Sequence, residues 1–183
     1  MKLQSCGIAV GLAFSDKINT GEDIDMAIEK VREYFKQWGR EEDILEFDTS
    51  SATVELASEA LGVEPCRIAK TLSFQSEEGA LLILAAGDAK IDNGKFKTEF
   101  NMKARMLPPE EVLKYTGHAI GGVCPFGLIK SLPVYLDISL KRFDYVYPAC
   151  GSGNSAIKLT CPELEQYSKY LKWVDVCKSW QVG

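Results

Sequence analysis

The run Gly121-Gly122-Val123-Cys124-Pro125-Phe126-Gly127 limits most strongly what this chain can fold into. Three glycines and a proline within seven positions exclude a helix and fit an ordinary strand poorly. Gly121 and Gly122 permit positive φ and a close approach of the backbone to a ligand, and Pro125 fixes the next bend. Such a loop can aim several backbone N–H groups at one point, which makes a small polar receptor. A tight turn between two core elements is the alternative.

A lysine interrupts an apolar strand pattern upstream, in Ile68-Ala69-Lys70-Thr71-Leu72. Because side chains alternate along a strand, Lys70 is expected to share the apolar face of Ile68 and Leu72. Burying an ammonium is costly unless it meets an anion or several acceptors. The pattern predicts a fixed positive charge on the floor of a pocket. A lysine at a strand edge whose amino group reaches water is the alternative.

The length of 183 residues with 46% hydrophobic content favours a single domain. We expect residues 23–183 to form that domain and residues 1–22 to be an N-terminal extension, either an extra strand or disordered. Cys6 to Phe14 is apolar but has neither a well charged start nor a cleavage site, so it does not indicate a secretory signal. No run is long enough for a membrane span. We expect a cytoplasmic protein without a membrane partner.

Cysteine usage argues against a metal or a disulfide framework. The six cysteines, at positions 6, 66, 124, 150, 161 and 177, form no Cys-x-x-Cys pair, and His118 is the one histidine. This scatter cannot complete a zinc cluster. We therefore expect reduced thiols, no metal and no cofactor.

Charge is distributed unevenly around a net value of −5. Residues 21–64 hold 13 acidic and 4 basic side chains, whereas residues 66–146 hold 9 acidic and 11 basic ones. An acidic chain is a poor candidate for wrapping a long nucleic acid. It could still hold one end of a strand against a locally basic face, to which Lys90, Lys95, Lys97, Lys103 and Arg105 contribute. A solvated charged surface is the alternative.

Hydrophobic periodicity and stop signals predict alternating helices and strands. Helices are expected over residues 23–38, from Ser50 or Ser51 to Leu61, over 93–102, from Pro108 to Gly117, and over 162–171. Strands are expected over 44–48, 66–74, 80–86, 105–107, 133–137, 145–148, 156–160 and 173–176, with 145–148 pairing with 156–160 and a short helix or turn over 138–143. Because hairpins and helical crossovers both occur, we expect the α/β class with a mixed sheet.

Two further motifs suggest chemistry only weakly. Cys124 and His118 are six residues apart around a glycine pair, which permits a thiol nucleophile with its base, and Asp137 is a conceivable orienting carboxylate. A small side chain packed under the loop is the favoured interpretation of Cys124. Gly151-Ser152-Gly153-Asn154-Ser155 fits neither the dinucleotide nor the P-loop spacing, and a hairpin loop is the favoured interpretation.

Taken in order, these segments resemble one family. The helix ending at Leu61 with Gly62-Val63, the lysine strand 68–72, the apolar strand 82–86, the stretch 117–127 and the segment 156–164 together are similar to the YbaK/EbsC family of prolyl-tRNA synthetase-associated editing domains. The resemblance covers about residues 26–173. It implies a single-domain, curved, barrel-like mixed sheet surrounded by helices.

The resemblance implies hydrolysis of the ester in a mischarged aminoacyl-tRNA, with no metal and no side-chain nucleophile. Its implied catalytic residues are Lys70, Gly121 and Gly122. Its implied substrate-binding residues are Thr71, Val123, Cys124, Pro125, Val54 and Ala149. The implied partners are the 3′ acceptor end of tRNA and, as a further candidate, prolyl-tRNA synthetase; oligomeric state is not readable.

The leading hypothesis is a free-standing trans-editing deacylase that acts on tRNA(Pro) carrying Ala, Cys, Ser or Thr. In cysteinyl-type members the segment matching Ala149 to Leu159 carries a serine and an aspartate, whereas this chain has Ala149 and Ala156 at the matching positions. That departure leaves the amino acid open and motivates two rivals. One is a binding or regulatory module without turnover, and the other is a hydrolase that uses Cys124 as nucleophile.

Overall fold

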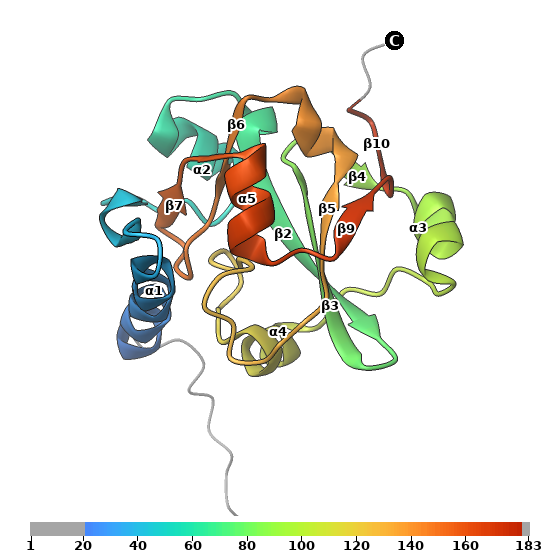
Figure 1. Ribbon diagram of the computed structural model, residues 1–183, viewed down its shortest axis with the longest axis horizontal. Helices are drawn as coiled ribbons and strands as arrows, with labels where there is room; N and C mark the ends of the chain where they lie inside the picture. The colour runs from blue at the N-terminus through green and yellow to red at the C-terminus, as the bar shows by residue number, and fades with distance from the viewer. Residues whose placement is uncertain (1–20, 181–183) are drawn as a thin grey trace, which may run out of the picture.

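The expected strand 80–86 is part of β3 (Gly79–Ala86), which lies in the interior of a six-stranded sheet. Residues 80–86 are apolar throughout and all buried. The computed structural model, shown in Figure 1, describes residues 21–180. Residues 1–20 of the expected extension therefore lie outside the described residues, whereas its last two residues, Gly21 and Glu22, begin helix α1 (Gly21–Lys36) rather than an extra strand or a disordered tail. Burial of β3 on both faces accounts for its lack of polar alternation.

The remaining elements include both helices and strands along residues 21–180, as the sequence predicts. They are α1 (Gly21–Lys36), η1 (Glu41–Asp43), β1 (Ile44–Glu46), α2 (Val54–Leu61), η2 (Pro65–Arg67), β2 (Ile68–Ser76), β4 (Lys90–Ile91), α3 (Asn93–Phe100), α4 (Pro109–Thr116), β5 (Val134–Asp137), η3 (Ile138–Arg142), β6 (Tyr145–Pro148), β7 (Ser155–Ile157), β8 (Leu159–Thr160), α5 (Cys161–Ser168), β9 (Lys172–Val174) and β10 (Cys177–Lys178), where η denotes a 3-10 helix.

The main sheet is mixed and curls into a half-barrel, with the strand order β8-β6-β2-β3-β5-β9. β2 and β3 form an antiparallel hairpin, and β6 pairs antiparallel with β8. The β2–β6, β3–β5 and β5–β9 pairs are parallel. The pairs β1–β7 and β4–β10 lie outside this sheet. The predicted α/β class with a curved mixed sheet is confirmed.

Helix boundaries follow local signals. In α1 the residues Ala27, Val31 and Phe35 repeat every four positions and are buried. Gly62 and Gly117 end α2 and α4 in the left-handed conformation, with φ values of 65° and 78°. Left-handed φ is costly for residues with a Cβ, so glycine marks these helix ends in the sequence.

Three local expectations are wrong. The strand expected over 105–107 is only an isolated antiparallel bridge between Met106 and Phe74. The cap of α2 is Thr53 rather than Ser50 or Ser51, because the Thr53 backbone is extended and its Oγ1 accepts from the Leu56 N–H at 3.2 Å. Only residues 159–160 of the expected strand 156–160 pair with β6, while residues 155–157 form β7 and pair with β1. The pairing partner of so short a strand depends on packing rather than on its own pattern.

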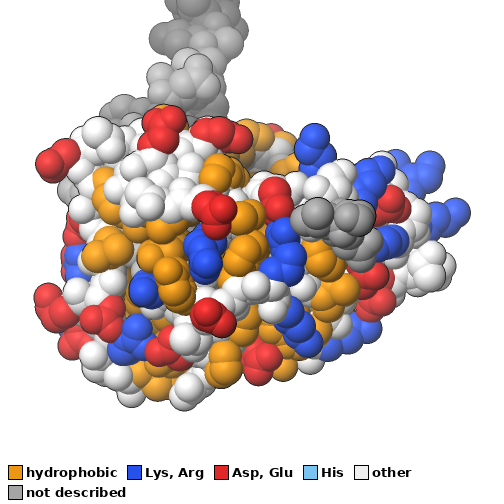
Figure 2. Space-filling model, turned by 90° about the horizontal axis from the view of Figure 1, so that it is seen from above, with side chains coloured by type: hydrophobic (Ala, Val, Ile, Leu, Met, Phe, Trp, Pro, Cys, Tyr) orange, Lys and Arg blue, Asp and Glu red, His pale blue; other side chains and the backbone are white. Residues whose placement is uncertain are grey.

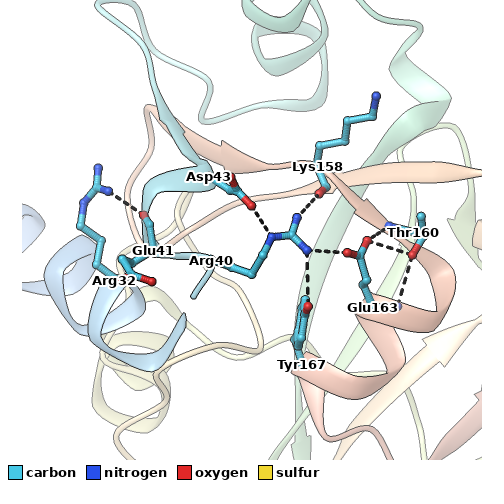
Figure 3. A network of polar contacts seen from close by, with 8 residues as sticks. All are labelled: Arg32, Arg40, Glu41, Asp43, Lys158, Thr160, Glu163 and Tyr167. Carbon is cyan, nitrogen blue, oxygen red and sulfur yellow. Dashed lines mark hydrogen bonds and ion pairs between the residues drawn. The ribbon is translucent and has the colours of Figure 1, made fainter. Parts of the chain in front are cut away.

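Arg40 ties the N-terminal part of the fold to α5 (Figure 3). Its guanidinium contacts the carboxylates of Asp43 and Glu163, and it lies 3.4 Å from the Tyr167 hydroxyl. Glu163 also completes a capping box with Thr160 at the start of α5. One arginine therefore links η1, which follows α1, to both the start and the end of α5.

Candidate active site

A pocket of about 290 Å³ lies between β2, the start of α2, the segment 106–107 and the glycine loop. Of the nine predicted site residues, the structure brings six together around this pocket: Val54, Lys70, Thr71, Gly121, Val123 and Ala149. The other three, Gly122, Cys124 and Pro125, are buried and do not line it. The lysine strand and the glycine loop, about 50 residues apart in sequence, thus share one cavity.

Lys70 is held in place by two backbone carbonyls. Its amino group donates to the Gly87 oxygen at 2.9 Å and to the Ala89 oxygen at 2.5 Å. An ammonium has three donors, so one remains for a ligand. Partial burial lowers the pKa of Lys70, and the carbonyl contacts compensate part of the loss of hydration. The acceptors that a partly buried ammonium requires are therefore present, and they are main-chain oxygens rather than an anion.

Gly121 and Gly122 differ in their surroundings. Gly121 has φ 94° and lines the pocket. Gly122 lies beneath it, where a Cβ would come within 2.6 Å of the backbone of Gly151 and Ser152. The Gly122 N–H donates to the Ala119 oxygen and its oxygen accepts from the Gly151 N–H, both at 3.0 Å. Gly122 therefore fastens the loop to the segment that joins β6 and β7.

This hydrogen bonding determines which loop N–H groups can meet a ligand. The Gly122 N–H is engaged, and the Cys124 N–H points to His118 Nδ1 at 3.4 Å. Within residues 21–180, the hydrogen bonds include none from the N–H of Gly121 or Val123. Since both of these residues line the pocket, their N–H groups are the candidate donors of an oxyanion-binding site.

Cys124 and His118 do contact each other, with the Cys124 Sγ 3.6 Å from His118 Nδ1, but both side chains are fully buried. Burial raises the pKa of the Cys124 thiol to about 12 and lowers the pKa of His118 to about 4. Asp137 cannot orient this pair, because its oxygens accept from the N–H groups of Ser139 and Val176. The pair is a packed core contact rather than an activated nucleophile.

The pocket wall is mostly small and apolar. Ala149 and Ala156 face each other in an isolated antiparallel bridge, and both line the pocket together with Ala57. Lys70 is the one charged side chain among the lining residues that the structure describes. Such a cavity suits a small, largely apolar group attached to a polar linkage.

The lining residues that were not predicted from the sequence include Met106, Ile120 and Tyr147. Met106 and Ile120 are 61% and 60% exposed, so they stand at the pocket rim. The position of Ile120, directly before the glycine pair, could have indicated that it lies at the pocket. Nothing in the local pattern distinguishes Tyr147 from an ordinary core residue of a strand.

No helix in the described part of the chain is long and apolar enough to cross a membrane. Among residues 21–180, no group of three or more His, Cys, Asp or Glu side chains is placed to hold a metal ion.

The model of the aminoacyl-tRNA editing domain family matches residues 48–167. The uncharacterized protein YwhH of Bacillus subtilis is 60% identical over 157 residues, which cover 85% of this chain and 100% of YwhH. The proline–tRNA ligase of Thermotoga maritima is 32% identical over 65% of this chain, and the match spans 21% of the ligase. A solved structure described as a "putative trans-editing enzyme for prolyl tRNA synthetase" superposes with a TM-score of 0.76 at 32% identity, covering 83% of this chain and 97% of that one.

Proposed function

Because the chain belongs to the aminoacyl-tRNA editing domain family, we propose that it is a trans-editing deacylase that hydrolyses the ester of mischarged aminoacyl-tRNA. The observation that carries the proposal is the shared pocket, in which Lys70, Gly121 and Val123 line one cavity. The ester that joins the amino acid to the terminal adenosine would lie between them.

The chemistry asks little of the protein, because an aminoacyl ester is already reactive. Water attacks the carbonyl carbon, the carbonyl oxygen becomes an oxyanion, and the ribose oxygen leaves with a proton that derives from the water. Each well-placed donor to the oxyanion contributes about 3 kcal/mol, a factor of about a hundred or more in rate. The N–H groups of Gly121 and Val123 supply such donors, and the third Lys70 proton positions the acyl end.

The substrate we propose is tRNA(Pro) carrying a small non-cognate amino acid, such as Ala, Cys, Ser or Thr. The alanines at 57, 149 and 156 leave room for a small side chain. Discrimination between amino acids that differ by one methylene is worth only about 1–3 kcal/mol, so several small residues can be accepted. The relation to prolyl-tRNA synthetase editing supports tRNA(Pro). A match along the whole of YwhH supports action as a free-standing protein.

The test is a deacylation panel with the purified protein and tRNA(Pro) charged separately with Ala, Cys, Ser, Thr and Pro. We expect release of at least one small amino acid well above the buffer rate, with cognate Pro-tRNA(Pro) spared. Release from none of these, nor from other mischarged tRNAs, would remove the enzymatic proposal. Ligand-induced melting shifts without release would then favour a binding module.

Substitutions at Lys70 and Cys124 distinguish a catalytic role of the ammonium from one of the thiol. Lys70→Met keeps the aliphatic stem and removes the ammonium, and we expect at least a hundredfold loss of kcat/KM. Cys124→Ala removes a thiol that does not line the pocket, so we expect less than a tenfold loss. Lys36→Met on α1 controls for the loss of one positive charge. Severe loss in Cys124→Ala with mild loss in Lys70→Met would contradict the mechanism.

A further inference from the structure

A second groove adjoins the site pocket along one stretch of chain, residues 102–107. Met106 and Leu107 line the pocket. An open groove of about 340 Å³ is lined by Gln75, Ser76, Glu77, Met102, Lys103 and Arg105. The same chain segment therefore passes from one hollow into the other.

The backbone of this segment runs beside the end of β2. The Gln75 N–H donates to the Arg105 oxygen at 2.8 Å, and the Leu107 N–H donates to the Ser73 oxygen at 3.0 Å. Ser73 lines the pocket and Gln75 lines the groove. Two residues of a strand span about 7 Å, so the groove starts within about one extended nucleotide of the pocket.

The side chains of Lys103 and Arg105 are exposed, and within the described part of the chain neither forms an ion pair. Three other basic residues near α3 are paired, Lys95 with Asp175, Lys172 with Glu99 and Lys178 with Asp92. Lys90 and Lys97 form no ion pair within residues 21–180 and do not line the groove. Seen from above, the α3 end of the molecule carries a gathering of Lys and Arg side chains (Figure 2). Lys103 and Arg105 are thus the cations without an ion pair that line the groove.

Two further features of the groove bear on its ligand. Ser76 lines the groove, and its Oγ is buried without a hydrogen-bond partner among the described residues. Glu77 is its one acidic lining residue and opposes the two cations. An anion that binds here would be attracted by Lys103 and Arg105 and weakly repelled by Glu77.

We propose that this groove binds the phosphates of the single-stranded 3′ end of tRNA as the strand leaves the pocket past Met106. The proposal rests on the proposed function and extends it by assigning the direction in which the strand runs. Phosphate contacts from Lys and Arg supply sequence-independent affinity, which suits an end that all tRNAs share.

The test is salt-dependent binding of an uncharged, fluorescein-labelled acceptor-stem hairpin that ends in single-stranded CCA, measured by anisotropy. The double variant Lys103→Gln/Arg105→Gln should bind more weakly. Each single-strand phosphate contact contributes about 0.7 to the slope of log affinity against log salt, so two contacts contribute about 1.4. Between 50 and 200 mM salt, the wild type should therefore lose about sevenfold more affinity than the double variant.

Matched variants control for net charge. Lys30→Gln/Lys36→Gln removes two charges from α1, at the other end of the molecule from α3 (Figure 1), and should keep the wild-type slope. Glu77→Gln should tighten binding. A hairpin without the CCA end should abolish the difference between the wild type and the Lys103/Arg105 variant. Equal slopes for wild type and that variant, or equal losses in both double variants, would overturn the proposal.

The two proposals fail separately. If the wild type releases amino acid but the slope is unchanged in Lys103→Gln/Arg105→Gln, only the groove assignment falls. If no mischarged tRNA is hydrolysed but the slope changes as expected, the enzymatic proposal falls and the groove remains an RNA-binding site. In an active enzyme, the double variant should raise KM, and its KM relative to wild type should fall about sevenfold between 50 and 200 mM salt, with single-turnover kcat within about twofold of wild type.

Discussion

Lowering the pH from 7 to 4.5 should destabilise the wild-type protein by about 2 kcal/mol more than a His118→Asn variant. His118 is fully buried, and its Nδ1 accepts from the Cys124 N–H while Nε2 has no partner among the described residues. Protonation would place an uncompensated charge in the core. Asparagine keeps an oxygen acceptor at this position and does not titrate.

The magnitude follows from the displaced pKa. Burial lowers the pKa of His118 from 6.5 to about 4, and the nearby Lys30 acts in the same direction. The unfolded chain therefore binds more protons between pH 6.5 and 4, so stability falls as the pH falls through that window. A pKa difference of this size has a ceiling of about 3 kcal/mol, of which about 2 kcal/mol develops between pH 7 and 4.5.

Urea unfolding of both proteins at the two pH values measures the effect. Other groups with lowered pKa, such as Glu163 with its hydrogen bonds from Thr160 and Arg40, contribute to acid sensitivity in both proteins and cancel in the comparison. Equal losses of unfolding free energy in wild type and variant would refute the argument that His118 is held neutral by burial.

Three further outcomes are expected. Gly122→Ala should lower the free energy of unfolding by about 1–3 kcal/mol, because its Cβ would press on the rigid backbone of Gly151. Gly153→Ala is the control: its Cβ would lie 3.4 Å from the nearest side-chain atom, so its stability should stay within about 1 kcal/mol of wild type. Equal melting temperatures for the two variants would contradict the packing argument. Arg40→Gln should cost about 1–2 kcal/mol in urea unfolding, since its side chain is only 23% exposed and bonds Glu163. A double-mutant cycle with Glu163→Gln should return a coupling above about 0.5 kcal/mol, and additive losses would mean that the pair contributes nothing.

Much of the fold was predictable because its signals are local. The glycines at 62 and 117 mark helix ends by their left-handed backbone, and the run 80–86 is apolar throughout because β3 is covered on both faces. The cap at Thr53 and the pairing of β7 with β1 were not predictable. In both cases several residues of similar propensity compete locally, and packing selects among them.

For the candidate site, the sequence identified the lysine strand and the glycine loop, but not which of the loop residues line the cavity. Lys70 and the loop 121–127 stand out in the sequence because a lysine in an apolar strand and a glycine pair each violate a local rule. That Gly122 fastens the loop while Gly121 and Val123 face the cavity was decided by the backbone contacts with Ala119 and Gly151. Whether a backbone N–H of the loop is free to bind a ligand depends on the segment that packs against the loop. Residue types alone do not predict that packing.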